Sequence, residues 1–172
     1  MTNLKKLTIA AAMTTCLMAA TNASADPLNA TLVWQGIVPE TGVSDNLIIT
    51  GAGGDLAEVM GTIAAEVDGT FKSSSLTLEA HTNDGDADNP QVGALQEVKW
   101  TLKKANITYG GVEVAGTTPE VLINNTKTEL NGTVDADVIK ASINQTAPLE
   151  ASDVSSKAVA ASITLIADVI SS

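Results

Sequence analysis

Short runs of alternating apolar and polar residues recur along most of the chain, separated by clusters of glycine, asparagine and aspartate. A period of two is typical of strands that bury one face, and the clusters are typical of turns. The runs that we expect to be strands are residues 28–38, 46–50, 70–80, 98–102, 105–109, 112–115, 121–123, 133–134, 138–143 and 158–170. Short strands at this spacing predict an all-β fold, either a sandwich or a barrel.

Residues 56–67 are the one stretch with some helical character. Their apolar residues fit neither the helical nor the strand period well, and Gly61 interrupts the stretch. Helix and strand therefore both remain open for it. We find no internal repeat, low-complexity tract or linker, so we expect a single domain.

The first 25 residues have the features of a secretory signal. Lys5 and Lys6 precede an apolar run over residues 7–20, and Ala-Ser-Ala ends at Ala25. This order predicts cleavage after Ala25. A membrane anchor is the alternative, but the run contains three threonines and is shorter than the roughly 20 residues that a span needs. A lipoprotein would use Cys16, but Met-Thr-Thr before it is a poor match to the small apolar residues expected there.

Composition narrows the classes of partner. Cys16 is the only cysteine, so the chain after Ala25 has none and cannot form a disulfide within itself. That part keeps all 20 acidic residues and seven lysines, which gives a formal charge of −13. Nucleic-acid binding requires a basic surface, so we expect no nucleic-acid partner, and an anionic membrane surface would repel the protein.

Catalytic groups are scarce. The chain has no arginine, its only histidine is His81, and no G-x-S-x-G, Walker or H-E-x-x-H pattern occurs. A lone histidine beside a turn is more often hydrogen-bonded or exposed than a general base. We therefore predict that the protein is not an enzyme and needs no cofactor.

Two loops resemble ligand-binding motifs only in part. Asp84, Asp86 and Asp88 have the spacing of a calcium loop, but the sixth position is Asn89 instead of glycine and the twelfth is Leu95 instead of glutamate. We expect a solvated hairpin loop there and no metal site. Residues 51–54 are glycine-rich but lack the lysine of a phosphate loop, so we expect a turn.

Both ends of the predicted mature chain are strand-like. Near the N-terminus, one face of the alternation carries Leu28, Ala30, Leu32 and Trp34. Exposed in water, these side chains and the strand edges would favour aggregation. The segment must therefore pair, either within its own domain or in another molecule.

The C-terminal run alternates in the same way. One face would carry Val159, Ala161, Ile163, Leu165, Ala167 and Val169. A helix is the alternative because alanine favours helices, but the β-branched residues favour a strand.

Four stretches resemble the subunits of chaperone–usher pili, closest to the α-clade that includes the colonisation-factor and common-pilus types. They are LNATLVWQGIVPE, SDNLIITGAGGDL, GTFKSSSLTLEAHTND and AASITLIADVISS. The resemblance implies an incomplete immunoglobulin-like sandwich, completed by a donor strand from a neighbouring subunit. Residues 1–25 would be the signal peptide, 26–38 the donor-strand extension and 39–172 the pilin domain.

The resemblance also implies roles and partners. Leu28, Ala30, Leu32 and Trp34 would be the donor side chains, and the set from Val159 to Val169 would line the acceptor groove that the chaperone recognises. The partners would be identical or related pilus subunits in a homopolymer, a periplasmic chaperone and an outer-membrane usher. The protein would pass through the periplasm to the cell surface and support adhesion, which raises a host-cell receptor as a further partner.

A self-contained secreted β-sandwich that binds a ligand, such as a carbohydrate-binding module, is the main alternative. Such sites usually present exposed aromatic side chains, and the candidates are Trp34, Phe71, Trp100 and Tyr109. A purified protein that is a stable monomer without partner or chaperone would favour this interpretation.

Overall fold

Antiparallel strands form nearly all the regular structure in the computed structural model, which describes residues 46–57, 60–86 and 88–170 and the backbone of residues 30–35. The predicted all-β fold is confirmed. In these residues the only helix is the single turn α1, Ala151–Val154.

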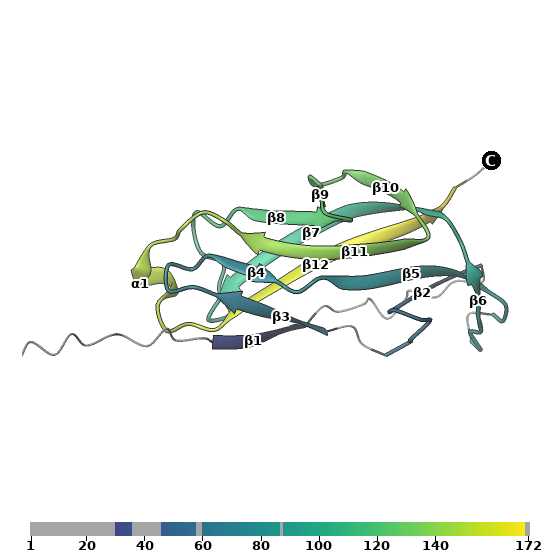
Figure 1. Cartoon of the computed structure of the whole chain (residues 1–172), viewed down its shortest axis with the longest axis horizontal. Helices are drawn as coiled ribbons and strands as arrows, with labels where there is room; N and C mark the ends of the chain where they lie inside the picture. The colour runs from purple at the N-terminus through teal and green to yellow at the C-terminus, as the bar shows by residue number, and fades with distance from the viewer. Residues whose placement is uncertain (1–29, 36–45, 58–59, 87, 171–172) are drawn as a thin grey trace, which may run out of the picture.

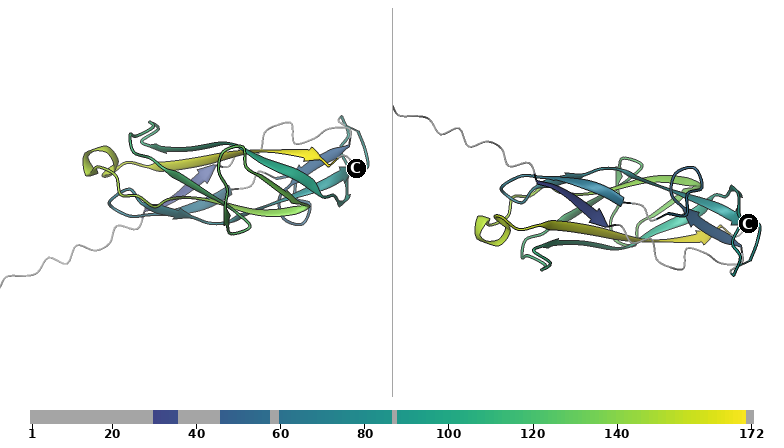
Figure 2. Two further views of the ribbon diagram at one scale, coloured as in Figure 1. Left: turned by 90° about the horizontal axis from the view of Figure 1, so that it is seen from above. Right: turned by 90° about the horizontal axis from the view of Figure 1, so that it is seen from below.

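The strands form two antiparallel sheets that lie in two layers (Figures 1 and 2). The smaller sheet has the order β10-β7-β12, with β7 at Val98–Tyr109, β10 at Thr133–Ala136 and β12 at Val159–Val169. The larger sheet follows the order β1-β3-β4-β11-β5-β2, with β6 beside β5 and β8 and β9 beside β11. Its strands are β1 Ala30–Gln35, β2 Leu47–Thr50, β3 Met60–Ala65, β4 Phe71–Ser73, β5 Leu76–Asn83, β6 Val92–Leu95, β8 Pro119–Ile123, β9 Thr126–Lys127 and β11 Val138–Gln145.

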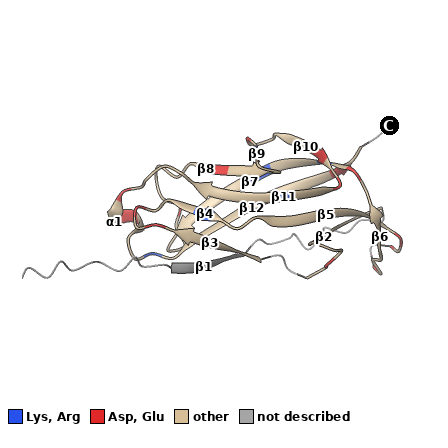
Figure 3. Cartoon of the chain, in the orientation of Figure 1, with Lys and Arg blue, Asp and Glu red and all other residues tan. Residues whose placement is uncertain are grey.

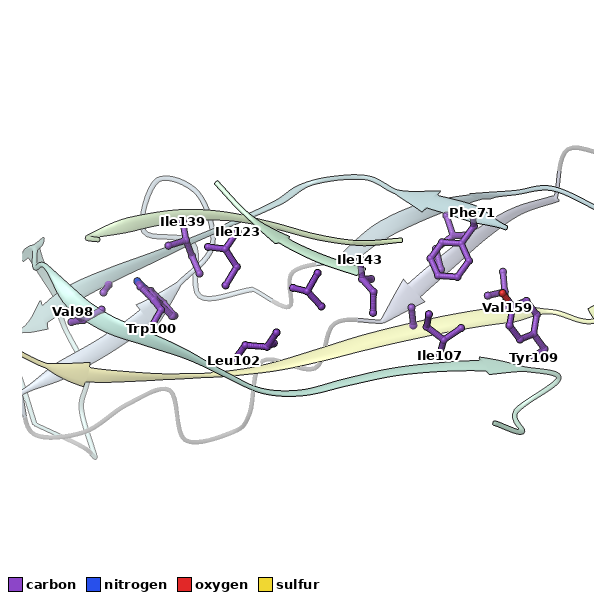
Figure 4. Packing of buried hydrophobic residues seen from close by; sticks show 14 of the residues in the cluster. Phe71, Val98, Trp100, Leu102, Ile107, Tyr109, Ile123, Ile139, Ile143 and Val159 are labelled. Atoms are coloured by element: carbon purple, nitrogen blue, oxygen red, sulfur yellow. The ribbon is translucent and has the colours of Figure 1, made fainter. Parts of the chain in front are cut away.

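One apolar core lies between the sheets (Figure 4). Ile123, Ile139, Ile143 and Phe71 of the larger sheet face Val98, Trp100, Leu102, Ile107, Tyr109 and Val159 of the smaller one. Trp100 is 1% exposed, and its indole Nε1 donates to the carbonyl of Ala136 at 3.0 Å. The bond satisfies the polar atom of the largest buried side chain, as burial requires.

Residues 98–102 and 105–109 were expected to be two strands, and this was wrong because they form the single strand β7. Its register with β12 shifts between Thr164 and Leu165, opposite Lys104 and Leu102. Lys103 is the extra residue of a β-bulge, and both Lys103 and Lys104 are exposed. A bulge lets two consecutive polar residues stay outside without ending the strand.

Residues 70–80 were expected to be one strand, but the structure divides them into β4 and β5. Serine side chains replace backbone pairing at the break. Ser73 Oγ accepts from the Ile143 N–H, and Ser74 Oγ accepts from the Thr62 N–H, both at 2.9 Å. The chain can therefore change partner from β3 to β2 while it stays beside β11.

The stretch 56–67, for which helix and strand were both open, contains strand β3. Residues 112–115 were expected to be a strand, but they form only one bridge, between Tyr109 and Val112. Strands β6 and β9 were not predicted. β9 forms because Asn124 and Asn125 adopt φ angles of 50° and 62°, which suit a two-residue hairpin turn.

Tyr109 connects the smaller sheet to the turn between β3 and β4. Its hydroxyl donates to the Gly69 carbonyl, and the residue is 2% exposed. Gly69 has a φ of +80°, and a Cβ there would lie 3.1 Å from a methyl group of Val154. Burial, with a smaller effect of Asp68, raises the pKa of Tyr109 to about 12.

We predict that Tyr109 makes stability depend on alkaline pH. Because its folded pKa lies above the value of 10 expected when unfolded, its contribution is complete below pH 10 and is lost as the pH rises towards 12. Urea unfolding from pH 7 to 11.5 checks this, with Tyr109→Phe as the control. The variant should lose about 1 kcal/mol at pH 7, because the hydroxyl bond is missing, and should show a shallower alkaline decline. An identical decline in both proteins would contradict the prediction.

Candidate functional site

Strand β1 is an added edge strand of the larger sheet. It pairs antiparallel with β3, from Ala30 opposite Ala65 to Gln35 opposite Met60. Its other side lies next to β12 of the smaller sheet, as Figure 2 shows. β1 and β12 share no ladder in the described part of the chain. β1 therefore lies between β3 on one side and β12 on the other. We call this position between β3 and β12 the seam.

The register sorts β1 into two faces. The predicted donor residues Ala30, Leu32 and Trp34 stand opposite Ala65, Ile63 and Gly61, of which Ile63 and Gly61 are buried and Ala65 is half-buried. Thr31, Val33 and Gln35 stand opposite the exposed Ala64, Thr62 and Met60. The register therefore places the predicted donor residues Ala30, Leu32 and Trp34 opposite the side of β3 that faces the interior. Leu28 and the cleavage site at Ala25 lie outside the described residues.

The second wall of the seam is β12, where the predicted strand is confirmed and the helical alternative is excluded. Val159 and Ala161 are 3% and 4% exposed. Ile163, Leu165 and Ala167 are partly buried against the core, and Val169 is 47% exposed. The predicted set therefore lies on the interior face, but its residues become more exposed towards the C-terminal end of the strand.

The two edges of the smaller sheet differ in chemistry. The β10–β7 ladder runs from Val98 to Thr101 and is followed by backbone bonds of Leu102 with Asn131 and Gly132, and the next residues of β7 are the exposed Lys103 and Lys104. Lysines on an edge hinder pairing with another strand. β12 carries no lysine, and Asp168 is its only charged residue. The β12 edge is therefore better suited than the opposite edge to pair with a further strand.

His81 serves the structure of the loops. It is 7% exposed, and its Nδ1–H donates to the Gly93 carbonyl at 3.0 Å, while Nε2 lies 3.1 Å from Glu79 Oε2. The Glu79 carboxylate also accepts from the N–H groups of Gly53 and Gly54, at 2.9 and 3.0 Å. The expected turn at residues 51–54 is confirmed, and it holds a carboxylate of the chain itself.

The acidic segment is the connection between β5 and β6, as expected for a hairpin loop. Asp86 Oδ1 accepts from the N–H groups of Asp88 and Asn89, and Asp84 Oδ1 accepts from the Thr82 hydroxyl. Among the described residues, no three histidine, cysteine or acidic side chains gather in a way that could hold a metal ion. These carboxylates act as local caps of the loop.

The aromatic side chains that a sugar site would use are in the core. Phe71, Trp100 and Tyr109 are 3%, 1% and 2% exposed, and the side chain of Trp34 lies outside the described part. A depression of about 560 Å³ at the ends of β3 and β4 has a mixed lining, with the charged residues Glu66, Asp68 and Lys72 beside apolar residues such as Ala64 and Pro148. Asp68 there already accepts from the N–H and hydroxyl of Thr70.

We predict that Glu79 stabilises the fold in its charged form. The Gly53 N–H, with smaller effects of His81 and Gly54, holds the pKa of Glu79 below its usual 4.5. Its contribution is therefore complete above pH 4.5 and is lost as the pH falls through the lowered pKa. Glu79→Gln should unfold at lower urea than the parent at pH 7, and the difference should shrink near pH 3. Glu113→Gln, at an exposed position, controls for the lost charge, and an equal effect of both would contradict the prediction.

No helix of the described residues is long and apolar enough to cross a membrane. No protein-family model matches the chain, and no curated protein matches it significantly. The candidate site therefore rests on the seam itself: the strand β1, a β3 face that matches its alternation, and a β12 edge that carries no lysine and a single charged residue, Asp168.

Proposed function

We propose that the protein is the structural subunit of a bacterial surface pilus of the chaperone–usher type, which polymerises by donor-strand exchange. The observation that carries the proposal is the position of β1. The strand is attached to the larger sheet only along the edge of β3, and residues 36–46 separate it from β2. An identical strand of a neighbouring molecule could make the same ladder.

The physical basis of exchange is that the two pairings are equivalent. A strand from the same chain and one from a neighbour would form the same backbone hydrogen bonds and bury the same apolar face. Exchange of an identical element between copies is therefore a low-cost route to assembly. Concentration and the strain of the connecting segment then decide which pairing dominates. In a pilus, each donor strand would enter the seam of the next subunit and leave no chain unpaired except at the ends.

Features of the sheets support an immunoglobulin-like sandwich that lacks its last strand. β4 and β5 form one chain path that changes partner within the larger sheet, and β12, the last strand, pairs only with β7 among the described strands. A strand placed beside β12 would complete the smaller sheet. In the proposal, the periplasmic chaperone supplies such a strand first, the usher mediates exchange, and residues Val159 to Val169 line the groove.

Export follows from the predicted signal peptide, and the proposed location is the fimbrium on the cell surface. The proposal gives the protein a mechanical role that needs no catalytic group. Adhesion to a host cell would arise from the assembled fibre, through a receptor of unassigned chemistry.

The first prediction of the proposal concerns the whole extension. Deleting residues 26–36 should leave a subunit that binds the chaperone but forms no polymer, because the strand that fills the seam is missing. Electron microscopy and size-exclusion chromatography of periplasmic extracts measure this. A synthetic peptide of residues 26–36 should raise the melting temperature of the deleted subunit. Normal polymers from the deletion variant would refute the proposal.

A second prediction separates the faces of the donor strand. Leu32 stands opposite Ile63, which is 1% exposed, whereas Thr31 stands opposite the exposed Ala64. Leu32→Lys should weaken assembly by about 2 kcal/mol or more, because an unpaired charge would be buried. Thr31→Lys, the matched control, should assemble normally. Polymer yield after equal expression is the measurement, and equal yields of the two variants would contradict the predicted faces.

A further inference from the structure

We infer that Gly61 sets the register of the strand that pairs with β3, because it leaves room for a large aromatic side chain directly opposite. The pairing partner that it selects is a strand with the size order of Ala30, Leu32 and Trp34. The choice of a second copy as partner rests on the proposed function, whereas the register role concerns the β1–β3 pair itself.

A glycine inside a strand needs an explanation. It weakens the strand through its backbone freedom and offers no side chain to pack, and it often marks a bulge or a close approach. Gly61 lies in a regular ladder with β1, and it is not among the glycines with positive φ. The other glycine within a described strand, Gly93, is explained by crowding, because a Cβ there would lie 2.2 Å from Thr82 Oγ1. Neither a turn nor a bulge accounts for Gly61.

The register supplies the explanation. Trp34 is the residue directly opposite Gly61, and Leu32 is opposite Ile63. The largest residue of β1 therefore pairs with the smallest residue of β3, on the face whose β3 residues are buried. Directly opposite residues are the closest cross-strand neighbours, so a glycine at this position of β3 leaves room for a large residue at the position opposite.

Shifted registers lose this match. A shift of one residue would turn the polar set of β1 to the interior. A shift of two residues in one direction would place Trp34 opposite Ile63, which is 1% exposed and has no room to spare. Size complementarity therefore distinguishes the correct register from the two-residue shift. Alternation alone does not, because it is the same in both registers.

Engineered cysteine pairs can report the register directly. In a background with Cys16→Ser, the chain contains no other cysteine. Thr31→Cys with Ala64→Cys joins directly opposite positions, which suit a disulfide, whereas Val33→Cys with Ala64→Cys reports the two-residue shift that would place Trp34 opposite Ile63. Ala64 is exposed, and Thr31 and Val33 stand opposite exposed residues of β3, so these replacements leave the core unchanged.

We expect the directly opposite pair to crosslink at least about tenfold more than the shifted pair in the parent. Gly61→Val should lower the yield of the directly opposite pair, and Gly61→Ala should lower it less. Thr62→Val, the control on the exposed face of β3, should leave it unchanged. Adding Trp34→Ala to Gly61→Val should restore the yield, because the larger side chain then stands on β3 and the smaller on β1.

Three results would overturn the inference. The first is equal crosslinking of the two pairs in the parent. The second is an unchanged yield in both Gly61→Val and Gly61→Ala. The third is a lower yield in Gly61→Val that Trp34→Ala does not restore, because a general folding defect would not depend on the residue opposite.

Non-reducing gels separate this inference from the proposed function. A disulfide within one chain changes its mobility, whereas disulfides between chains give a ladder of multimers. Directly opposite crosslinks found only within chains would support the register role and contradict polymerisation. A ladder formed mainly by the shifted pair would support polymerisation and overturn the role of Gly61.

Discussion

Burial of apolar faces between the two sheets is the constraint on which the rest of the structure depends. The predicted mature chain has no cysteine, so no disulfide within it can support the fold. Among the described residues, no group of three histidine, cysteine or acidic side chains could hold a metal ion. The sheets cover each other around Trp100 and the isoleucines of β8 and β11. At the seam, however, β3 and β12 would each present an apolar interior face and an open edge. A further strand must cover them, and β1 does so within this chain.

Polar contacts at the two ends of the molecule serve that core. Glu79 holds the turn after β2 through two glycine amides, and Tyr109 holds the turn before β4 through the Gly69 carbonyl. In both cases a buried or half-buried side chain satisfies backbone groups that a tight turn leaves free. Such bonds contribute modestly, but leaving their partners unpaired would cost more. They fix the ends of β2, β3 and β4, and with them the edge that receives β1.

Charge limits how copies of the chain can associate. The chain carries a formal charge of −11, and Figure 3 shows acidic residues in loops at both ends of the molecule. Copies with a high charge of one sign repel one another, and salt screens this repulsion. In the proposed polymer, contacts between copies would therefore come from backbone pairing and apolar burial at the seam. The same charge favours solubility of the single chain.

The sequence by itself determined the all-β class, the two faces of β12 and the alternation of β1. A period of two is a local property, because successive residues of a strand point to opposite faces. It also located the turns at residues 51–54 and between β5 and β6 through their glycine, asparagine and aspartate residues. Only the tertiary structure decided that Lys103 is a bulge instead of a strand end, that β4 and β5 are separate, and that residues 60–65 are a strand. These outcomes depend on β12, β11 and β1, which are distant in sequence. For the same reason, Ala30, Leu32 and Trp34 could be named from their pattern, whereas Gly61 and Ile63 opposite them could not, since the register of two strands is set by long-range packing and not by either strand alone.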